Sequence, residues 1–394
     1  LALLEVAFLL YYGRISPSAA FLADILECGH RTQFGQRQAN ASLFDTDAHA
    51  KCRCIRDLLL FLAIECLNLE AALDVVPEGI AAPDDAALAP LATDPDALER
   101  CLVQLEKAAS DVAYAPLLLS FALVLRRLDE VGSHTPLEPR LAATLDVVDH
   151  GPQIWRRLLQ GAFDPSMQLF DTLHSLVTSP LLRTATRALG ASNLSALAYR
   201  AVFKGLLLTI TELVQPEYLP DLDSLVDLWC LTFRAMPGDV PDGIAALCTQ
   251  FWTQDIQYPT RASLLDTVRR RFPASFLPLV RLAHALSGTA PDAPSPDTVA
   301  AMMNALAHVS SVALILPQRT AGLGLWETLD EAGAPSVTYR LQAYMPVAHT
   351  QMHVPAGTHG VLISPSGQAP AIVLWQLATP ISAWHILHDA FVSS

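Results

Sequence analysis

The residues in this sequence whose types could hold a metal ion are His49, Cys52 and Cys54. Zinc ligands usually include cysteine pairs separated by about two to four residues. A single residue separates Cys52 from Cys54, and no second cysteine pair lies nearby. On a helix this spacing would also place the two thiols on different faces. We therefore interpret them as buried or idle cysteines and predict no metal site.

Three further histidines, His349, His353 and His359, lie close together among segments that we expect to form strands. Side chains along a strand alternate between two faces, so the three rings would be spread over different faces or into turns. We interpret them as loop residues. His284 lies among leucines in a helical pattern and is expected at the core or its edge.

No motif for nucleophilic, acid–base or nucleotide chemistry stands out. The pair Gly322 and Gly324 lacks the third glycine and the preceding strand of a dinucleotide-binding loop, and the patterns G-x-x-x-x-G-K, H-E-x-x-H and G-x-S-x-G do not occur. Carboxylates beside prolines are explained by helix caps and solvated loops; they are Asp84 and Asp85, Asp221 and Asp223, and Asp239 and Asp242. Serine–proline dipeptides, a weak signal for phosphorylation, occur at Ser16, Ser179, Ser295 and Ser364. We predict no catalytic and no cofactor-binding residue.

The charge balance argues against nucleic acid as a partner. The 394 residues carry a net charge of -14, and the longest basic run is only Arg269 to Arg271. Phosphate binding needs clustered lysines and arginines. We also expect no small-molecule substrate.

The apolar content raises the question of a membrane, because 52 % of the residues are apolar and 16 % are charged. The most lipid-like run, Leu117 to Leu125, is shorter than the roughly 20 residues that a span requires and is followed by Arg126 and Arg127. The run from Lys204 is interrupted by Glu212. We expect no transmembrane helix, so the apolar surplus must be buried against protein, in this chain or in a partner.

The seven cysteines are odd in number and irregular in spacing, which indicates reduced thiols in the cytosol or nucleus rather than a disulfide framework. The chain begins at Leu1, without methionine, in what resembles the middle of a helix. We expect it to be a fragment.

Helical periodicity dominates the chain as far as about Leu316. Apolar residues recur in steps of three and four, as in the stripe Ile55, Leu58, Leu59, Leu62, Cys66, Leu69 and Leu73. Asp94-Pro95 and Asp164-Pro165 are typical helix starts, and Gly288 is a plausible helix end. We predict ten to fifteen helices, either as irregular pairs stacked in a line or as a compact all-α domain. The length favours the stack, since single cores stop growing near about 250 to 300 residues.

The pattern changes near the end of the chain. The segment Val361 to Ile363, a Ser-Pro-Ser-Gly turn and the segment Ala371 to Leu377 predict a hairpin. Two or three short strands suggest a small β barrel set into the helical chain, and the closing segment SAWHILHDAFV is expected as a last strand leading back into helix. The predicted domains are a helical part (1–316), a linker (317–336) and a β insertion with a return to helix (337–394).

The polar stretch FGQRQANASLFD, Phe34 to Asp45, interrupts two apolar blocks and is predicted to join two helices. We expect Gly35 to permit a tight reversal and Asn40 or Ser42 to cap the next helix. Phe34, Leu43 and Phe44 would hold the loop on the helices, while Arg37 and Gln38 would bind carbonyl groups at the preceding helix end. The sharper alternative is a partner site on this loop, because loops often carry function.

Five segments in order resemble the N-terminal half of the nucleoporin 188 family, large scaffold proteins of the inner ring of the nuclear pore complex. They are LLEVAFLLYYGRISPS, FGQRQANASLFD, YAPLLLSFALVLRRL, FPASFLPLVRLAHALSG and HVPAGTHGVLI followed by VLWQ. The F-G-x-R-Q-x-N and V-P-x-G-T-x-G patterns are the most specific. The resemblance implies an irregular HEAT/ARM-like α-helical solenoid with an SH3-like β-barrel insertion near the C-terminal end.

The same resemblance implies a structural role at the nuclear pore complex in the nuclear envelope. The implied partners are other scaffold and linker nucleoporins and transport factors, and the implied role is to support pore assembly and nucleocytoplasmic transport. Two alternatives come from other classes of protein. One is a transport-receptor-like solenoid that binds cargo or Phe-Gly repeats in grooves between helices. The other is an enzyme whose site is too scattered in sequence to be seen.

Overall fold

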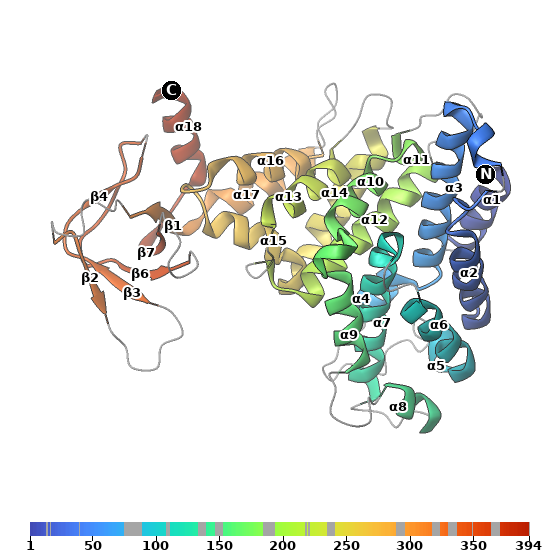
Figure 1. Cartoon of the computed structure of the whole chain (residues 1–394). Helices are drawn as coiled ribbons and strands as arrows, with labels where there is room; N and C mark the ends of the chain where they lie inside the picture. Colours follow the sequence, from blue (N-terminus) through green and yellow to red (C-terminus); the bar gives the residue numbers. More distant parts are fainter. Residues whose placement is uncertain are drawn as a thin grey trace. The chain divides into compact units, whose positions relative to one another are not determined.

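The computed structural model is mainly helical, with a small antiparallel sheet near the C-terminus (Figure 1). The chain divides into two compact units, Leu1–Ile244 (unit 1) and Ala245–Ser394 (unit 2). The structure describes residues 1–12, 15, 17–38, 40–74, 89–107, 111–132, 139–145, 153–183, 194–216, 219, 221–234, 241–288, 296–316, 324–329, 337–348, 350–363 and 371–393.

Unit 1 is built from helices alone in the part of the chain that is described. They are α1 (Ala2–Tyr11), α2 (Ala19–Thr32), η1 (Ala41–Leu43), α3 (Thr46–Glu65), α4 (Leu69–Asp74), α5 (Ala89–Ala92), α6 (Pro95–Lys107), η2 (Val112–Tyr114), α7 (Ala115–Gly132), α8 (Pro139–Leu145), α9 (Ile154–Ala162), η3 (Pro165–Met167), α10 (Leu169–Val177), α11 (Pro180–Arg183), α12 (Leu194–Leu213) and α13 (Leu222–Phe233). Helix α14 (Pro241–Thr253) contains the division between the units.

Unit 2 combines helices with the sheet. Its helices are η5 (Asp255–Gln257), α15 (Pro259–Arg270), α16 (Phe276–Leu286), α17 (Pro296–Ala307) and α18 (Ala383–Ser393). Its strands are β1 (Val309–Ile315), β2 (Trp326–Leu329), β3 (Thr338–Leu341), β4 (Met345–Pro346), β5 (His353–Val354), β6 (His359–Leu362) and β7 (Ile372–Ile381).

Helix α7 forms the centre of unit 1. Every residue from Ala115 to Leu125 is buried, including Ser120, whose hydroxyl donates to the carbonyl oxygen of Pro116 at 2.7 Å. A helix that is apolar on all sides must be covered on all sides. Helices α3, α4, α9, α10 and α12 supply that cover.

Packing in unit 1 is not limited to neighbours in sequence, since α12 contacts α3, α4 and α7 as well as α11 and α13. In a strictly linear stack, each helical pair contacts only the pairs beside it. The contacts of α12 therefore give unit 1 some of the character of the compact helical domain that the sequence left as an alternative.

A buried ion pair joins α7 to α12. The Arg127 guanidinium donates to Glu212 at 2.5 Å and to Glu130 at 2.6 Å, and the side chains of Arg127 and Glu212 are 4 % and 9 % exposed. Burial alone disfavours the charge of Arg127, but its hydrogen bonds and attraction to Glu130 and Glu212 outweigh that effect and raise its pKa. Arg127 and Glu212, two of the charged residues that end or interrupt the apolar runs in the sequence, are thus partners inside the fold.

The predicted helical stripes are largely confirmed, with one division that the sequence did not show. The expected steps of three and four recur, for example, in α13, where Leu225, Leu228 and Phe233 are buried. The stripe from Ile55 to Leu73, however, belongs to two helices, because α3 ends at Glu65 and Asn68 adopts a left-handed conformation (φ 49°) before α4. The apolar spacing continues across this turn, which hid it.

The predicted helix ends have mixed outcomes. Asp94 accepts from the backbone of Ala97 at 3.0 Å, as expected for a cap of α6, and Gly288 follows α16 with φ 62°. Asp164 caps only the short 3-10 helix η3, and α10 begins after it at Leu169.

The stretch Phe34 to Asp45 joins α2 to α3, as predicted. Gly35 has φ 79°, and Phe34 is fully buried against Gly29 and the ring of Tyr114. The predicted caps are wrong, because the carboxylate of Asp45 accepts from Ala48 at 2.7 Å and so caps α3. An ionised carboxylate at a helix N-terminus is a strong cap, since it also complements the helix dipole.

The other residues of this joint behave differently from one another. Arg37 binds the end of α2 through its backbone N–H, which donates to the carbonyl of Thr32 at 2.9 Å. The Gln38 amide donates to Gly35 instead, at 2.8 Å. Leu43 is 80 % exposed and does not hold the loop, whereas the Phe44 ring contacts His49.

The sheet of unit 2 has five strands in the order β1-β7-β6-β3-β2, and β4 with β5 forms a separate two-stranded sheet. The predicted hairpin is confirmed as an antiparallel pairing of β6 with β7, in which Val361 faces Leu374. Its predicted turn, residues 364–367, lies outside the described residues. The closing segment forms helix α18 rather than a strand.

Two predicted boundaries near the sheet are wrong. Strand β1 lies in the range 1–316 that was predicted to be helical, and β2 lies in the predicted linker 317–336. A short apolar run such as Val309 to Leu316 has no period that separates a buried strand from a helix. Its pairing with β7, at the other end of the sheet segment, decides the matter.

Among the described residues, no helix is both long enough and apolar enough to cross a bilayer.

The α7–α12 ion pair leads to a stability prediction. We expect Glu212→Ala to lower the free energy of unfolding by about 2 to 3 kcal/mol, because it leaves a buried guanidinium with one carboxylate fewer. Arg140→Ala is the control, since the Arg140–Asp96 pair is 64 % and 72 % exposed and should matter by less than about 1 kcal/mol. Urea unfolding followed by circular dichroism measures both; equal losses would contradict the assignment.

The packing of Trp375 leads to a second prediction. A β-carbon at Gly360 would lie 2.5 Å from Cε3 of Trp375, whereas one at Gly205, inside α12, would lie 3.7 Å from Leu69. We expect Gly360→Ala to destabilise the protein by about 1 to 3 kcal/mol through overpacking. Gly205→Ala should stabilise it by about 0.5 to 1 kcal/mol through helix propensity. Melting curves of the two variants should move in opposite directions.

Candidate functional site

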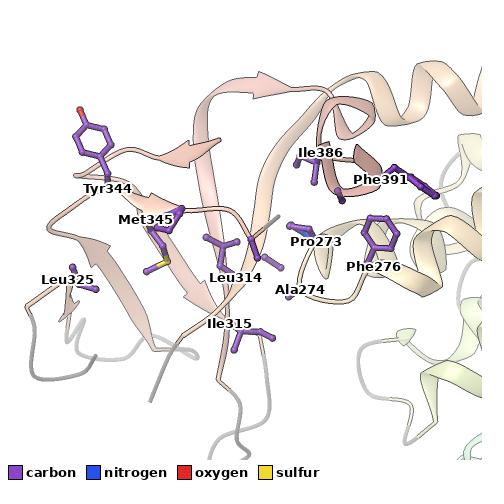
Figure 2. Close-up of a pocket in the computed structure, with 14 residues that line it drawn as sticks. Pro273, Ala274, Phe276, Leu314, Ile315, Leu325, Tyr344, Met345, Ile386 and Phe391 are labelled. Atoms are coloured by element: carbon purple, nitrogen blue, oxygen red, sulfur yellow. The ribbon is translucent and has the colours of Figure 1, made fainter. Parts of the chain in front are cut away.

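An apolar cavity of about 870 Å³ lies beside β1 in unit 2 (Figure 2). Its size is within the range of roughly 300 to 1,000 Å³ that is usual for ligand-binding pockets. The residues around it come from five parts of the unit: the segment Pro273 to Phe276 after α15, strand β1, Leu325 beside β2, strand β4 with its neighbours, and helix α18. Representative lining residues are Pro273, Ala274, Ile315, Met345, Ile386 and Phe391.

Strand β1 is an edge of the five-stranded sheet, and this edge forms one wall of the cavity. Part of the edge is already paired within the chain. The N–H of Ala313 donates to the carbonyl of Phe272 at 2.8 Å, and the N–H of Ala274 donates to the carbonyl of Ala313 at 3.2 Å. The contact is an isolated parallel bridge, and the chain leaves the edge to begin α16 at Phe276.

The opposite walls are held in place by short-range contacts. Met345 and Val354 are buried in the β4–β5 pair, and the N–H of Val347 donates to the carbonyl of Met352 at 2.9 Å. Helix α18 buries Ile386 and is tied to α17 by the indole of Trp384, which donates to the carbonyl of Met303 at 3.2 Å.

Two aromatic side chains on different walls remain open to solvent. Tyr344 is 70 % exposed and Phe391 is 71 % exposed, and both line the cavity. Figure 2 shows their side chains far apart, Tyr344 beside the strands and Phe391 on α18. Exposed aromatic residues around a concave apolar surface are typical of binding sites.

The described residues that line the cavity carry no formal charge. They include no aspartate, glutamate, lysine, arginine or histidine, and the sequence from 341 to 388 contains none of the first four. Unit 2 as a whole holds seven arginines and eight carboxylates, so almost all of the net charge of -14 belongs to residues 1–244. This described part of the lining suits binding of an uncharged apolar group.

Comparison with known proteins gives no family for the chain: no protein-family model matches it, and no curated protein matches it.

The residues that were considered for metal binding are placed on α3. Cys54 is buried, Cys52 is half-buried, and the His49 ring packs edge-on against Phe44 with centroids 5.7 Å apart. Burial raises the pKa of the Cys54 thiol, with a further contribution from Asp57. Within the described ranges, no three histidine, cysteine or carboxylate side chains are grouped so as to hold a metal ion.

The C-terminal histidines are not brought together. His353 lies in β5 and His359 begins β6, which belong to different sheets, and both are exposed. They are therefore strand residues rather than the predicted loop residues. His349 lies outside the described residues, and His284 is on the exposed side of α16 rather than in the core.

The carboxylate and serine candidates have structural roles where they are described. Asp221 caps α13 by accepting from the backbone of Ser224 at 2.9 Å, as predicted. Ser179 is buried and donates to Asp57 at 2.7 Å, which leaves it inaccessible to a kinase. Gly324 has φ 62°. Asp223 is exposed in the first turn of α13. The other candidates lie outside the described residues; they are Ser16, Asp84, Asp85, Asp239, Ser295, Gly322 and Ser364, together with the side chain of Asp242.

The cavity was missed in the sequence because its residues look like ordinary core. One signal was present, namely a run from 341 to 388 without any formally charged residue in a chain of 394. A run of 48 residues cannot be buried completely in a small unit, so part of this uncharged run must lie on the surface and form an apolar patch there.

The cysteines provide a test of the packing in unit 1. Burial raises the pKa of Cys66 to about 12, with help from Glu65, and burial raises the pKa of Cys101 to about 12, whereas Cys28 is exposed. We expect Ellman's reagent at neutral pH to modify Cys28 quickly and the two buried thiols only after unfolding. Cys28→Ser should remove the fast phase.

The same shifts give a pH dependence. An unfolded thiol ionises near its ordinary value of 9.0, and the folded Cys66 and Cys101 ionise only near about 12. The unfolded state therefore loses protons first, and the stabilisation from these thiols, complete below pH 9.0, should decrease as the pH rises toward 12. Unfolding of Cys66→Ala, compared with the parent chain across this window, should show a weaker dependence on pH; an unchanged dependence would contradict the burial of Cys66.

Proposed function

We propose that this chain is a non-catalytic scaffold component of the nuclear pore complex inner ring, similar to the N-terminal half of the nucleoporin 188 family. One observation carries the proposal: the order of elements is helices, then a small antiparallel sheet, then a return to helix at α18. The resemblance in sequence implies this order.

The two most specific segments of the resemblance lie where the backbone demands particular residues. In FGQRQAN, Gly35 has φ 79° and Phe34 is fully buried. In HVPAGTHG, Gly357 has φ 85°, its N–H donates to Leu341 at 2.7 Å, and the Thr358 hydroxyl donates to Pro355 at 2.7 Å. Similarity at such positions supports a shared local structure, since few other residues fit a left-handed backbone.

The finer architecture is part of the proposal. The helices would form an irregular HEAT/ARM-like solenoid, in which unit 1 closes on itself more than a regular repeat does. The five-stranded sheet, with β4 and β5, would be an SH3-like barrel inserted between α17 and α18.

Several surface features suit an assembly role. Large apolar side chains remain exposed on one side of α1, namely Leu3, Val6 and Leu10 at 87 %, 55 % and 52 %. Apolar patches of this kind are typical of surfaces that bind protein. The proposed partners are other scaffold and linker nucleoporins and transport factors, and the proposed location is the nuclear envelope at the pore.

Localisation and stoichiometry test this proposal. We expect the full-length protein, tagged at its own locus, to stain the nuclear rim, to recover slowly after photobleaching and to co-purify in fixed ratio with inner-ring components. The fluorescent tag expressed alone is the control. Diffuse staining with rapid exchange, and release by the GTP-bound small GTPase that drives transport, would favour the transport-receptor alternative instead.

A further inference from the structure

We infer that the cavity beside β1 binds a short, extended and uncharged segment of a partner protein, which pairs with the free part of the β1 edge and places apolar side chains in the cavity. This inference concerns unit 2 alone and does not depend on the proposed role at the nuclear pore.

The backbone of β1 provides the first argument. Leu316 donates its N–H to Ala371, beside β7, at 2.8 Å, and Ala313 donates its N–H away from β7, to Phe272. Backbone groups alternate in direction along a strand, so the N–H and C=O of Ile315 also point away from β7. Among the described residues, no hydrogen-bond partner of these two groups is present.

The existing bridge shows that this edge accepts an added strand. The segment Phe272 to Ala274 pairs with Ala313 and then turns away from the sheet. Ile315 is the next residue of β1 whose backbone groups point outward, and this segment does not reach it. Unpaired N–H and C=O groups on a sheet edge are a template for another chain. An extended peptide can satisfy both groups, whereas a hydrocarbon ligand can satisfy neither.

The cavity provides the second argument. Ile315 belongs to its lining, so a strand added at this residue runs along the cavity. In a strand every second side chain lies on the same face, and these side chains would enter a space bounded by Met345 and Ile386, both buried. The exposed rings of Tyr344 and Phe391 would flank them.

The described part of the lining carries no charge, and this sets the chemistry of the partner that we infer. A carboxylate or ammonium group placed in this cavity would lose hydration without meeting an opposite charge. We therefore expect a segment in which aliphatic or aromatic residues alternate with small polar ones. Its backbone would pair with the β1 edge, its apolar side chains would enter the cavity, and its polar side chains would face solvent.

The test uses the whole 394-residue chain and a capped octapeptide in which leucine and serine alternate, with a fluorescent label for anisotropy. Two further peptides carry the same side chains but N-methyl groups, one at the leucine nitrogens and one at the serine nitrogens. An added strand turns one set of N–H groups toward β1 and the other toward solvent. We expect one methylated peptide to lose at least about tenfold in affinity and the other to bind nearly as well as the parent.

Protein variants complete the test. Ile315→Pro removes the outward N–H but keeps an apolar side chain, and should weaken binding about tenfold, while Ile315→Val should not. Ala390→Glu places a charge in the lining and should abolish binding, whereas His385→Glu adds the charge to an exposed position of the same helix and should leave binding intact. Circular dichroism identifies any variant that fails to fold, and the α18 pair remains informative if Ile315→Pro does.

Three results would overturn the inference. Equal binding of both methylated peptides would mean apolar contact without edge pairing. Failure of the parent peptide to bind, together with binding of Nile red that Ala390→Glu abolishes, would mean that the cavity takes a small apolar molecule. The chain could also form a dimer that excludes the peptide and that Ala390→Glu abolishes. This result would mean that a second copy of the chain occupies the cavity.

Discussion

The fold of unit 1 depends on one constraint, which is that α7 has almost no side suited to water. From Ala115 to Leu125 every residue is buried, so the surrounding helices must arrive from every direction. The helix can end inside the unit only because its first charged residues have partners. Arg127 meets Glu130 on its own helix and Glu212 on α12, and the contact with Glu212 ties α7 to α12. Burial of apolar surface drives the packing of helices around α7. Because Arg127 is paired with carboxylates, α7 can stay buried beyond the last residue of its apolar run.

Unit 2 is governed by a different constraint, the need to satisfy the edges of a small sheet. One edge, β1, is partly covered by the segment Phe272 to Ala274, and the uncovered remainder faces an apolar cavity. The interior strands are held closely, since Trp375 and Val373 on β7 occupy the space that a side chain at Gly360 would need. The unit thus combines a closely packed sheet interior with an edge on which, among the described residues, the backbone groups of Ile315 have no partner. An open backbone edge beside the apolar side chains described in the lining suits the recognition of an extended chain that we infer.

Much of the local structure could be predicted from single residues. Asp94 with Pro95 indicated a helix start, Gly35 a tight reversal and Gly288 a helix end, and each has the conformation or bond that its chemistry favours. The errors share one cause: two local signals competed, and a distant contact or a stronger group decided between them. Asn40 and Ser42 were reasonable caps for α3, but the carboxylate of Asp45 is a stronger one and lies closer to the helix. Val309 to Ile315 could form helix or strand, and β7, more than fifty residues later, supplies the pairing that makes it a strand. The cavity was not predicted at all, because its residues are brought together from five separate segments.

The sequence by itself determined that the chain is mainly helical with a small sheet near its end, because apolar period, caps and turn residues act over a few positions. Through the placement of Arg126, Arg127 and Glu212, it also indicated that the apolar runs do not belong to membrane-spanning helices, and no described helix is both long enough and apolar enough to cross a bilayer. Only the tertiary structure decided that Arg127 and Glu212 are partners, that Ser179 is buried on Asp57, and that β1 is an edge beside an apolar cavity. These facts depend on which segments meet across long distances in sequence. Such meetings are selected by the sum of many burial and pairing energies, which no local pattern contains.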